Sequence, residues 1–414
     1  MSTIVGAPPV VDEILRYNRD RKPRLVRLKL QRMDQDAFAF FRGTDHLFAR
    51  AWPELRPPDV GPSILICGDL HLENFGAYRT DDGEFLYDIN DFDEALVAPC
   101  SLDLVRCTTS ILLAAQLWGL TPIQALRIML AYLDRYRATV LDSAQIRQVG
   151  EVALGTGRGP IWNLLGRTAR GDQAELLERN TKTDKAGNRR IRRNSGKYPA
   201  IGAKKAALLR EAIEGYGRQT GRPEAYRVLD VAGRVVGIGS LGLRRYVVLI
   251  EGGGSQEQNR LLDIKEARPS ALRGCTDQAQ PEARGDDARR VVEAQRRLQA
   301  RPTAGLDTLE VDARAYRMRE LIPEENRSSL DRLRKRPGRL RRAVAVAGRL
   351  TGWAHLRGSR VDGEDRGGEL ARWAEGPGLD AVIASAVRYA DRTRRDYVAY
   401  HEAFTAQRLG KADG

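Results

Sequence analysis

The chain has 414 residues, of which 42% are hydrophobic and 30% charged, and this composition predicts a soluble globular fold with a sizeable core. Lys and Arg number 69 and Asp and Glu 55, so the formal charge of +14 favours anionic partners: nucleotides, phosphorylated metabolites, nucleic acid or acidic lipid. The sequence has no CxxC pair, no HExxH motif, no apolar run of ~18 residues and no signal-peptide pattern. These absences argue against a disulfide framework, a histidine metal site and a membrane partner, and they predict a cytoplasmic protein.

The first part of the chain combines predicted helices with a cluster of acidic residues. Residues 12–55 are typical of two helices, and residues 63–67 of a buried strand. Surface acids need no apolar neighbours, whereas carboxylates at the ends of buried strands often bind a metal or move a proton. The stretch from 66 to 95 sets five polar side chains among apolar residues: Asp69, Asn74, Asp88, Asp91 and Asp93.

The segment GDLHLEN, from Gly68 to Asn74, closely resembles the catalytic loop HGDxHxxN of aminoglycoside and choline kinases. Only the first histidine of that pattern is replaced, by Cys67. The resemblance implies that Asp69 accepts the proton of a substrate hydroxyl and that Asn74, five positions later, holds Mg²⁺. It implies a kinase-like phosphotransferase acting on a small molecule.

A second carboxylate for Mg²⁺ is expected shortly afterwards, because this ion prefers oxygen ligands and shares them with substrate phosphates. The stretch DFDEALVAPCSLDL resembles a run of the small-molecule kinases, which favours Asp91 as the metal ligand and leaves Asp88 and Asp93 as rivals. In the same resemblance Asp103 supports the catalytic loop and does not touch substrate. The alternative is a buried acidic turn without chemistry.

The middle of the chain is predicted to be mainly helical. Two core helices are expected over residues 101–120 and 121–142, the second beginning at Thr121-Pro122. Residues 150–220 continue as helix, interrupted by a basic loop, residues 182–197, with seven basic residues and no apolar periodicity. That loop is predicted to be either a solvated linker or a cover over an acidic substrate.

From Tyr226 the sequence becomes rich in β-forming residues and predicts an antiparallel sheet followed by one helix. A GxGxxG motif at Gly237, Gly239 and Gly242, with Ser240 inside it, leads into a strand, so it does not fit a dinucleotide fingerprint that opens a helix. A glycine-rich turn between strands can lay backbone N–H groups over phosphates, as in protein kinases. A plain hairpin is the alternative.

The next strand places Lys265 after alternating apolar residues, as in the VAIK strand of kinases, where the lysine pairs with phosphates. Such a lysine needs a carboxylate to orient it, and Glu293 on the following helix is the preferred candidate over Glu266 and Glu282. Singly, an exposed lysine and a solvated glutamate are the simpler interpretations. In this order they favour a nucleotide site, with the Lys265 and Glu293 side chains within about 4 Å.

The chain as a whole resembles the bacterial family called domain of unknown function 2252, which is grouped with protein-kinase-like folds. The matching stretches, including FAFFRGT, GDLHLENFG, DINDFDE and KEARPS, span roughly residues 30–325. The glycine-rich turn and lysine follow the catalytic loop here, whereas they precede it in ordinary kinases. We therefore predict an α+β, two-lobed protein-kinase-like fold that is circularly permuted. The expected parts are a helical catalytic lobe (1–220), a β-rich nucleotide lobe (221–328) and closing helices (329–414).

These features predict an ATP- and Mg²⁺-dependent enzyme that transfers the γ-phosphoryl group to an unidentified small-molecule or protein acceptor. AMP transfer from the same site stays open, because Arg244 and Arg245 lie near the glycine-rich turn. A nucleotide-binding pseudokinase and a nucleic-acid binder are further alternatives. Arg42 is expected to reach a phosphate or carboxylate or to form a structural ion pair, whereas His71 and His355 are expected to brace the fold.

Overall fold

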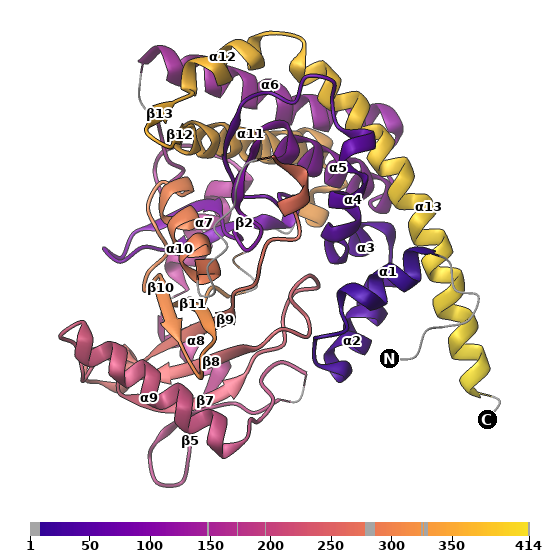
Figure 1. The fold of residues 1–414 in the computed structure, drawn as a ribbon. Coiled ribbons are helices and arrows are strands. Elements are labelled where there is room, and N and C mark those ends of the chain that lie inside the picture. Colours follow the sequence, from indigo (N-terminus) through magenta and orange to yellow (C-terminus); the bar gives the residue numbers. More distant parts are fainter. Residues whose placement is uncertain are drawn as a thin grey trace.

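The computed structural model describes residues 9–146, 149–171, 173–194, 196–277, 286–323, 326 and 330–412 (Figure 1). Helices from both ends of the chain form one body, and a five-stranded antiparallel sheet lies against it. The mixed α+β character predicted from the sequence is confirmed. Among the described helices, none combines the length and the apolar character that a membrane span requires.

Four short helices open the chain, where the sequence predicted two. They are α1 (Pro9–Tyr17), α2 (Pro23–Met33), α3 (Ala37–Gly43) and α4 (Asp45–Leu55). Pro23 occupies the first turn of α2, where its missing N–H costs nothing. Asp36 caps α3 by accepting a hydrogen bond from the backbone N–H of Ala39 at 2.7 Å. These local signals divide a stretch that looks continuous in its hydrophobic pattern.

The core of the helical body is made of four long helices and the shorter α12: α5 (Ser101–Leu117), α6 (Pro122–Ile146), α11 (Pro337–Gly358), α12 (Gly367–Glu375) and α13 (Gly378–Ala412). Helix α11 packs closely on α6, because Gly348 lacks the Cβ that would lie 2.1 Å from the Tyr132 carbonyl oxygen. Helix α13, yellow in Figure 1, runs beside α5 and also contacts α1, α3 and α4. The two ends of the chain therefore belong to the same body.

Two small antiparallel pairs carry the acidic stretch. Strand β1 (Ser63–Ile66) pairs with β4 (Leu96–Pro99), and β2 (Phe75–Arg79) pairs with β3 (Phe85–Ile89). The short 3₁₀ helix η1 (Leu72–Asn74) leads directly into β2. The predicted catalytic loop therefore lies between β1 and η1, and the predicted metal-binding stretch between β3 and β4. A further small pair, β12 (Arg360–Val361) with β13 (Glu364–Asp365), separates α11 from α12.

The large sheet has the strand order β10-β11-β9-β8-β7, and every neighbouring pair is antiparallel. Along the chain, the glycine-rich turn lies between β7 and β8, and one helix lies between β9 and β10. The elements are β7 (Val228–Gly233), β8 (Arg245–Ile250), β9 (Arg260–Glu266), α10 (Asp286–Leu298), β10 (Asp307–Glu310) and β11 (Ala315–Glu320). The sheet and its helix agree with the sequence prediction, and the GGGS stretch forms the connection between β8 and β9.

Both faces of the sheet are covered by residues that precede it in the chain. Helix α9 (Ala203–Gln219) packs on one face through Leu209 and Ile213. The other face is covered by α8 (Gln173–Asn180), the hairpin β5 (Thr181–Thr183)–β6 (Arg189–Ile191), and Tyr198. Much of the basic stretch 182–197, predicted to be a loop, thus forms a hairpin that packs on the sheet. The preceding helix α7 (Pro160–Arg170) lies against β2 and β3.

Candidate active site

A single cleft brings together residues that lie about 170 positions apart in sequence. The β1–η1 loop and the β3–β4 loop form one side, and the glycine-rich turn and β9 form the other. The residues predicted for catalysis, metal binding and phosphate binding meet here, with Glu293 and Gly242 outside the lining. The lining comprises Arg21, Arg42, Asp45, Cys67, Asp69, His71, Asn74, Asp91, Asp93, Glu94, Gly237, Ile238, Gly239, Ser240, Leu243, Arg245 and Lys265.

The loop that carries Asp69 is held in place by a buried carboxylate. Asp103, on the first turn of α5, accepts hydrogen bonds from the backbone N–H groups of Cys67 at 3.0 Å and Gly68 at 2.8 Å. Gly68 has a φ of +90°, and a Cβ there would lie 2.3 Å from the Glu94 carbonyl oxygen. His355 also contacts Asp103, at 3.3 Å, which explains its burial in the core. The supporting position expected of Asp103 is therefore what the structure shows.

Asp69 is paired with an arginine that the sequence analysis did not single out. The Arg106 Nε donates to Asp69 Oδ1 at 2.7 Å, and the guanidinium is fully buried at 3.7 Å from the Phe41 ring centroid. Burial raises the pKa of Asp69 to about 7, although Arg106 opposes this shift. The signal for Arg106 was available, because it is a lone charge within the apolar α5 stretch after Asp103.

Asn74 and Asp91 present the oxygen atoms that a magnesium ion would use. The Asn74 side-chain amide donates to the Asp69 carbonyl oxygen at 2.6 Å, which leaves the Asn74 amide oxygen for a cation. Burial alone would raise the pKa of Asp91, but nearby Lys265 and arginines hold it below its usual range, so the carboxylate is ionised.

Mg²⁺ is commonly held by one or two carboxylates plus substrate phosphates, so this donor set fits it. Within the described ranges, no group of three or more His, Cys, Asp or Glu side chains is placed to hold a metal by itself. Asp88 does not line the cleft, and its carboxylate accepts a hydrogen bond from the Ala300 backbone N–H at 3.0 Å.

The prediction that Glu293 orients Lys265 is wrong in this structure. The Lys265 Nζ forms an ion pair with Asp93 and lies 3.7 Å from Asp91 Oδ1. The Glu293 side chain is 58% exposed and pairs with Arg289 at 2.7 Å. The buried stripe of α10 includes Val291 and Val292, which turns Glu293 to solvent. Asp93, considered only as a rival metal ligand, is the partner of this lysine.

Helix α10 nevertheless contacts the β3–β4 loop of the cleft through another side chain. The Arg290 guanidinium donates to the carbonyl oxygens of Asp93 at 2.9 Å, Ala95 at 2.6 Å and Arg268 at 2.8 Å. These bonds join the helix to the loop that carries Asp91 and Asp93 and to the end of β9. The helix thus positions the acidic loop through backbone contacts.

The glycine-rich turn is held by basic side chains of helix α2 and of the turn that precedes it. Gly237 and Gly242 have φ angles of +77° and +93°, which explains why glycine occupies both positions. The Gly237 carbonyl oxygen accepts from Arg32 at 2.8 Å, and the Gly239 carbonyl oxygen accepts from Lys29 at 3.2 Å and from Arg21. Burial lowers the pKa of Lys29 well below its usual range. Lys29 and Arg32 lie among the other basic residues of α2, so no sequence pattern distinguishes them.

The remaining predictions have structural outcomes. Arg42 pairs with Glu73 at 2.6 Å, so the structural ion pair is present, and Arg42 also lines the cleft. The His71 Nδ1 accepts from the Glu73 backbone N–H at 3.2 Å, which is the expected bracing contact. Arg245 lines the cleft, whereas Arg244 does not and pairs with Glu266 at 3.1 Å.

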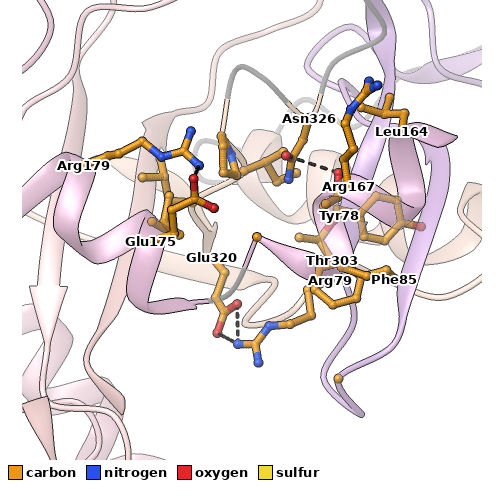
Figure 2. Close-up of a pocket in the computed structure, with 18 residues that line it drawn as sticks. Tyr78, Arg79, Phe85, Leu164, Arg167, Glu175, Arg179, Thr303, Glu320 and Asn326 are labelled. Atoms are coloured by element: carbon orange, nitrogen blue, oxygen red, sulfur yellow. Dashed lines mark hydrogen bonds and ion pairs between the residues drawn. The ribbon is translucent and has the colours of Figure 1, made fainter. Parts of the chain in front are cut away.

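The structure also has two larger cavities, whereas the cleft itself has a small volume of about 80 Å³. A cavity of about 690 Å³ shares Arg42, Gly237 and Ile238 with the cleft and extends between α5, η1 and the start of the glycine-rich turn. A second cavity of about 530 Å³ lies between the β2–β3 hairpin, α7, α8 and the end of β11 (Figure 2). This second cavity shares no lining residue with the cleft.

Comparison with known proteins identifies one family. A family model described as "Uncharacterized protein conserved in bacteria (DUF2252)" matches residues 21–403. No curated protein and no solved structure matches the chain.

Proposed function

The chain belongs to the DUF2252 family, and from the geometry of its cleft we propose that it is an ATP- and Mg²⁺-dependent phosphotransferase with a permuted, kinase-like architecture. The transferred group is the γ-phosphoryl of ATP, and the acceptor is a hydroxyl group. The acceptor itself is an unidentified small molecule or protein. The following observations support this proposal.

The observation that carries the proposal is the meeting of two distant motifs in one cleft. Asp69, Asn74 and Asp91 come from the helical body, and they line the same space as Lys265 and the start of the glycine-rich turn. Lys265 lies on the third strand of the sheet segment, as the corresponding lysine does in protein kinases. A coincidental match of short motifs would not be expected to bring these side chains together.

Each residue has a distinct part in the proposed reaction. The Asp69 carboxylate accepts the proton of the attacking hydroxyl, while Lys265 and Arg245 bind phosphate oxygens. Asn74 and Asp91 would hold magnesium, which neutralises charge on the phosphates when bound. Arg106 orients Asp69 through the 2.7 Å hydrogen bond. Positioning and charge stabilisation supply most of the rate enhancement in such transfers.

The proposal is tested by measuring how the melting temperature of the protein changes when ATP and Mg²⁺ bind. ATP with Mg²⁺ is expected to stabilise the folded protein by about 2.7 kcal/mol at a concentration of 100 Kd, since it binds only the folded state. Lys265→Ala is expected to lose most of this shift because it removes the phosphate-binding ammonium. Glu293→Gln, on the exposed face of α10, is the matched control and should keep it. If titration with ATP and Mg²⁺ gives no change in melting temperature, the proposal is contradicted.

The pH dependence of transfer gives an independent prediction. Because burial raises the pKa of Asp69 to about 7, the base is protonated and inactive below that pH. We expect kcat/KM to rise about tenfold per pH unit below about 7 and to level off above it. The profile is measured with saturating metal, and Asp69→Asn should remove the inflection from any residual activity. An inflection near 4 in the wild type, the ordinary value for an aspartate, would contradict the raised pKa of Asp69.

Adenylyl transfer is a second candidate, favoured by the position of Arg245. This arginine adds a positive charge beside Lys265 in the cleft and leaves open which phosphate lies nearest the acceptor. Mass spectrometry of the modified acceptor distinguishes the two reactions, because the product carries either phosphate or adenylate. Nucleotide binding without any transfer would instead indicate a regulatory, pseudokinase-like role.

A further inference from the structure

We infer that the adenosine part of the nucleotide binds in the cavity of about 690 Å³ beyond the glycine-rich turn, and not on the sheet face that carries Lys265. The inference rests on the proposed function, because it assumes that the triphosphate lies in the cleft of Asp91 and Lys265. It names the site for the base and ribose, which the cleft of about 80 Å³ is too small to hold.

The sheet face next to Lys265 is closed by the chain itself. Alternation along β9 places Asp263 on the same face as Lys265, and Asp263 is 1% exposed. Three arginines bind its carboxylate and fill the adjoining space: Arg234 at 2.6 Å, Arg245 at 2.7 Å and Arg317 at 3.0 Å.

Apolar side chains cover the rest of that face. Leu177, Ile191 and Tyr198, each at most 3% exposed, pack on Val247 and Leu261. A base entering from Lys265 along this face would have to break the arginine cluster and then displace the β5–β6 hairpin. A third side of the cleft is bounded by Asp45. Burial alone would raise the pKa of this carboxyl, but His46, Lys29 and Arg106 hold it below its usual range, and a phosphate chain is repelled beside the ionised carboxylate.

The 690 Å³ cavity adjoins the cleft and has a lining suited to a nucleoside. It shares Arg42, Gly237 and Ile238 with the cleft, so a molecule in the cavity ends beside the phosphate-binding groups. Trp118 offers aromatic surface to a base, and the volume of the cavity lies within the usual range for ligand pockets. The cavity is also lined by three basic residues, Arg32, Arg42 and Lys197, against the acidic Glu73 and Asp331.

The cavity of Figure 2 does not serve the same purpose. Two ion pairs cross or border it, Arg79 with Glu320 at 2.7 Å and Glu175 with Arg179 at 2.6 Å. Because it shares no lining residue with the cleft, a base bound there would not lie next to the phosphate-binding groups. Phe85, one of the aromatic side chains that line this cavity and labelled in Figure 2, supplies a matched control for Trp118.

The test separates the two ends of the nucleotide by calorimetry with three probes: adenosine, inorganic tripolyphosphate with Mg²⁺, and a non-hydrolysable ATP analogue with Mg²⁺. Trp118→Ala is expected to weaken the binding of adenosine and of the analogue about tenfold or more, because a stacking partner is lost. The affinity for tripolyphosphate should not change. Trp118→Phe should restore most of the binding. Phe85→Ala should affect none of the probes, and Lys265→Ala should weaken tripolyphosphate but not adenosine.

The outcomes distinguish failure of the inference from failure of the proposed function. If tripolyphosphate binding depends on Lys265 but adenosine binding is unaffected by Trp118→Ala, the phosphate site stands and the assignment of the base pocket is overturned. The same conclusion follows if Phe85→Ala weakens adenosine. If adenosine binding depends on Trp118 but the analogue binds no tighter than adenosine, the cavity is a nucleoside site and the proposed phosphotransferase function fails.

Discussion

Asp69→Asn is expected to lower phosphoryl transfer by about 10²–10⁴-fold while leaving nucleotide binding intact. The substitution removes the proton acceptor but can keep a hydrogen bond with Arg106, so the loop and the metal ligands should stay in place. Asp91→Asn is expected to lower transfer as well and also to weaken Mg²⁺-dependent ATP binding, because it removes a charged ligand. Single-turnover transfer and calorimetric titration of ATP with and without Mg²⁺ measure the two effects separately.

Asp88→Asn is the matched control, because Asp88 belongs to the same acidic stretch and lies outside the cleft. Its carboxylate accepts from the backbone N–H groups of Ile89 at 2.8 Å and Ala300 at 3.0 Å, so the variant should lose stability. The fraction that remains folded should transfer phosphoryl at the wild-type rate. Near-normal turnover by both Asp69→Asn and Asp91→Asn, or a loss confined to Asp88→Asn, would contradict the assignment.

The short motifs of the cleft were predictable because their structure is local. The Asp69 to Asn74 loop depends on one glycine with a positive φ and on a spacing that the sequence shows directly. The antiparallel sheet followed from alternating apolar residues and glycine-rich turns. The meeting of the two motifs followed only from the resemblance, since no pattern within either one specifies its partner.

The errors concern orientation and burial, which depend on the whole fold. The spacing of Val291, Val292 and Leu298 shows which side of α10 is buried, and that pattern places Glu293 on the exposed side. The prediction for Glu293 followed instead from the order of the kinase-like motifs along the chain. The hairpin of the basic stretch was missed because Ile191 and Tyr198 are isolated apolar residues without periodicity. Arginines are mostly exposed in proteins, so a buried cluster around Asp263 had no signal.

Asp263→Asn is expected to destabilise the protein by about 3–5 kcal/mol, the cost of breaking a buried ion pair by removing one partner. Burial alone would raise the pKa of Asp263, but Arg234, Arg245 and Arg317 hold it well below its usual range, so the carboxylate is ionised in the folded protein. The neutral amide would leave three buried guanidinium groups facing one another. Urea denaturation followed by circular dichroism measures the loss.

Asp312→Asn is the matched control, since Asp312 lies in the turn between β10 and β11, 58% exposed, and pairs with Lys205 at 2.9 Å. Removing this surface pair should cost less than about 1 kcal/mol. The pH dependence gives a second readout, because the folded-state pKa of Asp263 is depressed. Its stabilisation is complete above the unfolded-state pKa of about 3.9 and is lost as pH falls below it. Wild type should therefore lose its advantage over Asp263→Asn only in acid. If the two proteins have equal stability at neutral pH, the arginine cluster does not depend on Asp263, and the sheet face beside Lys265 is not locked by it.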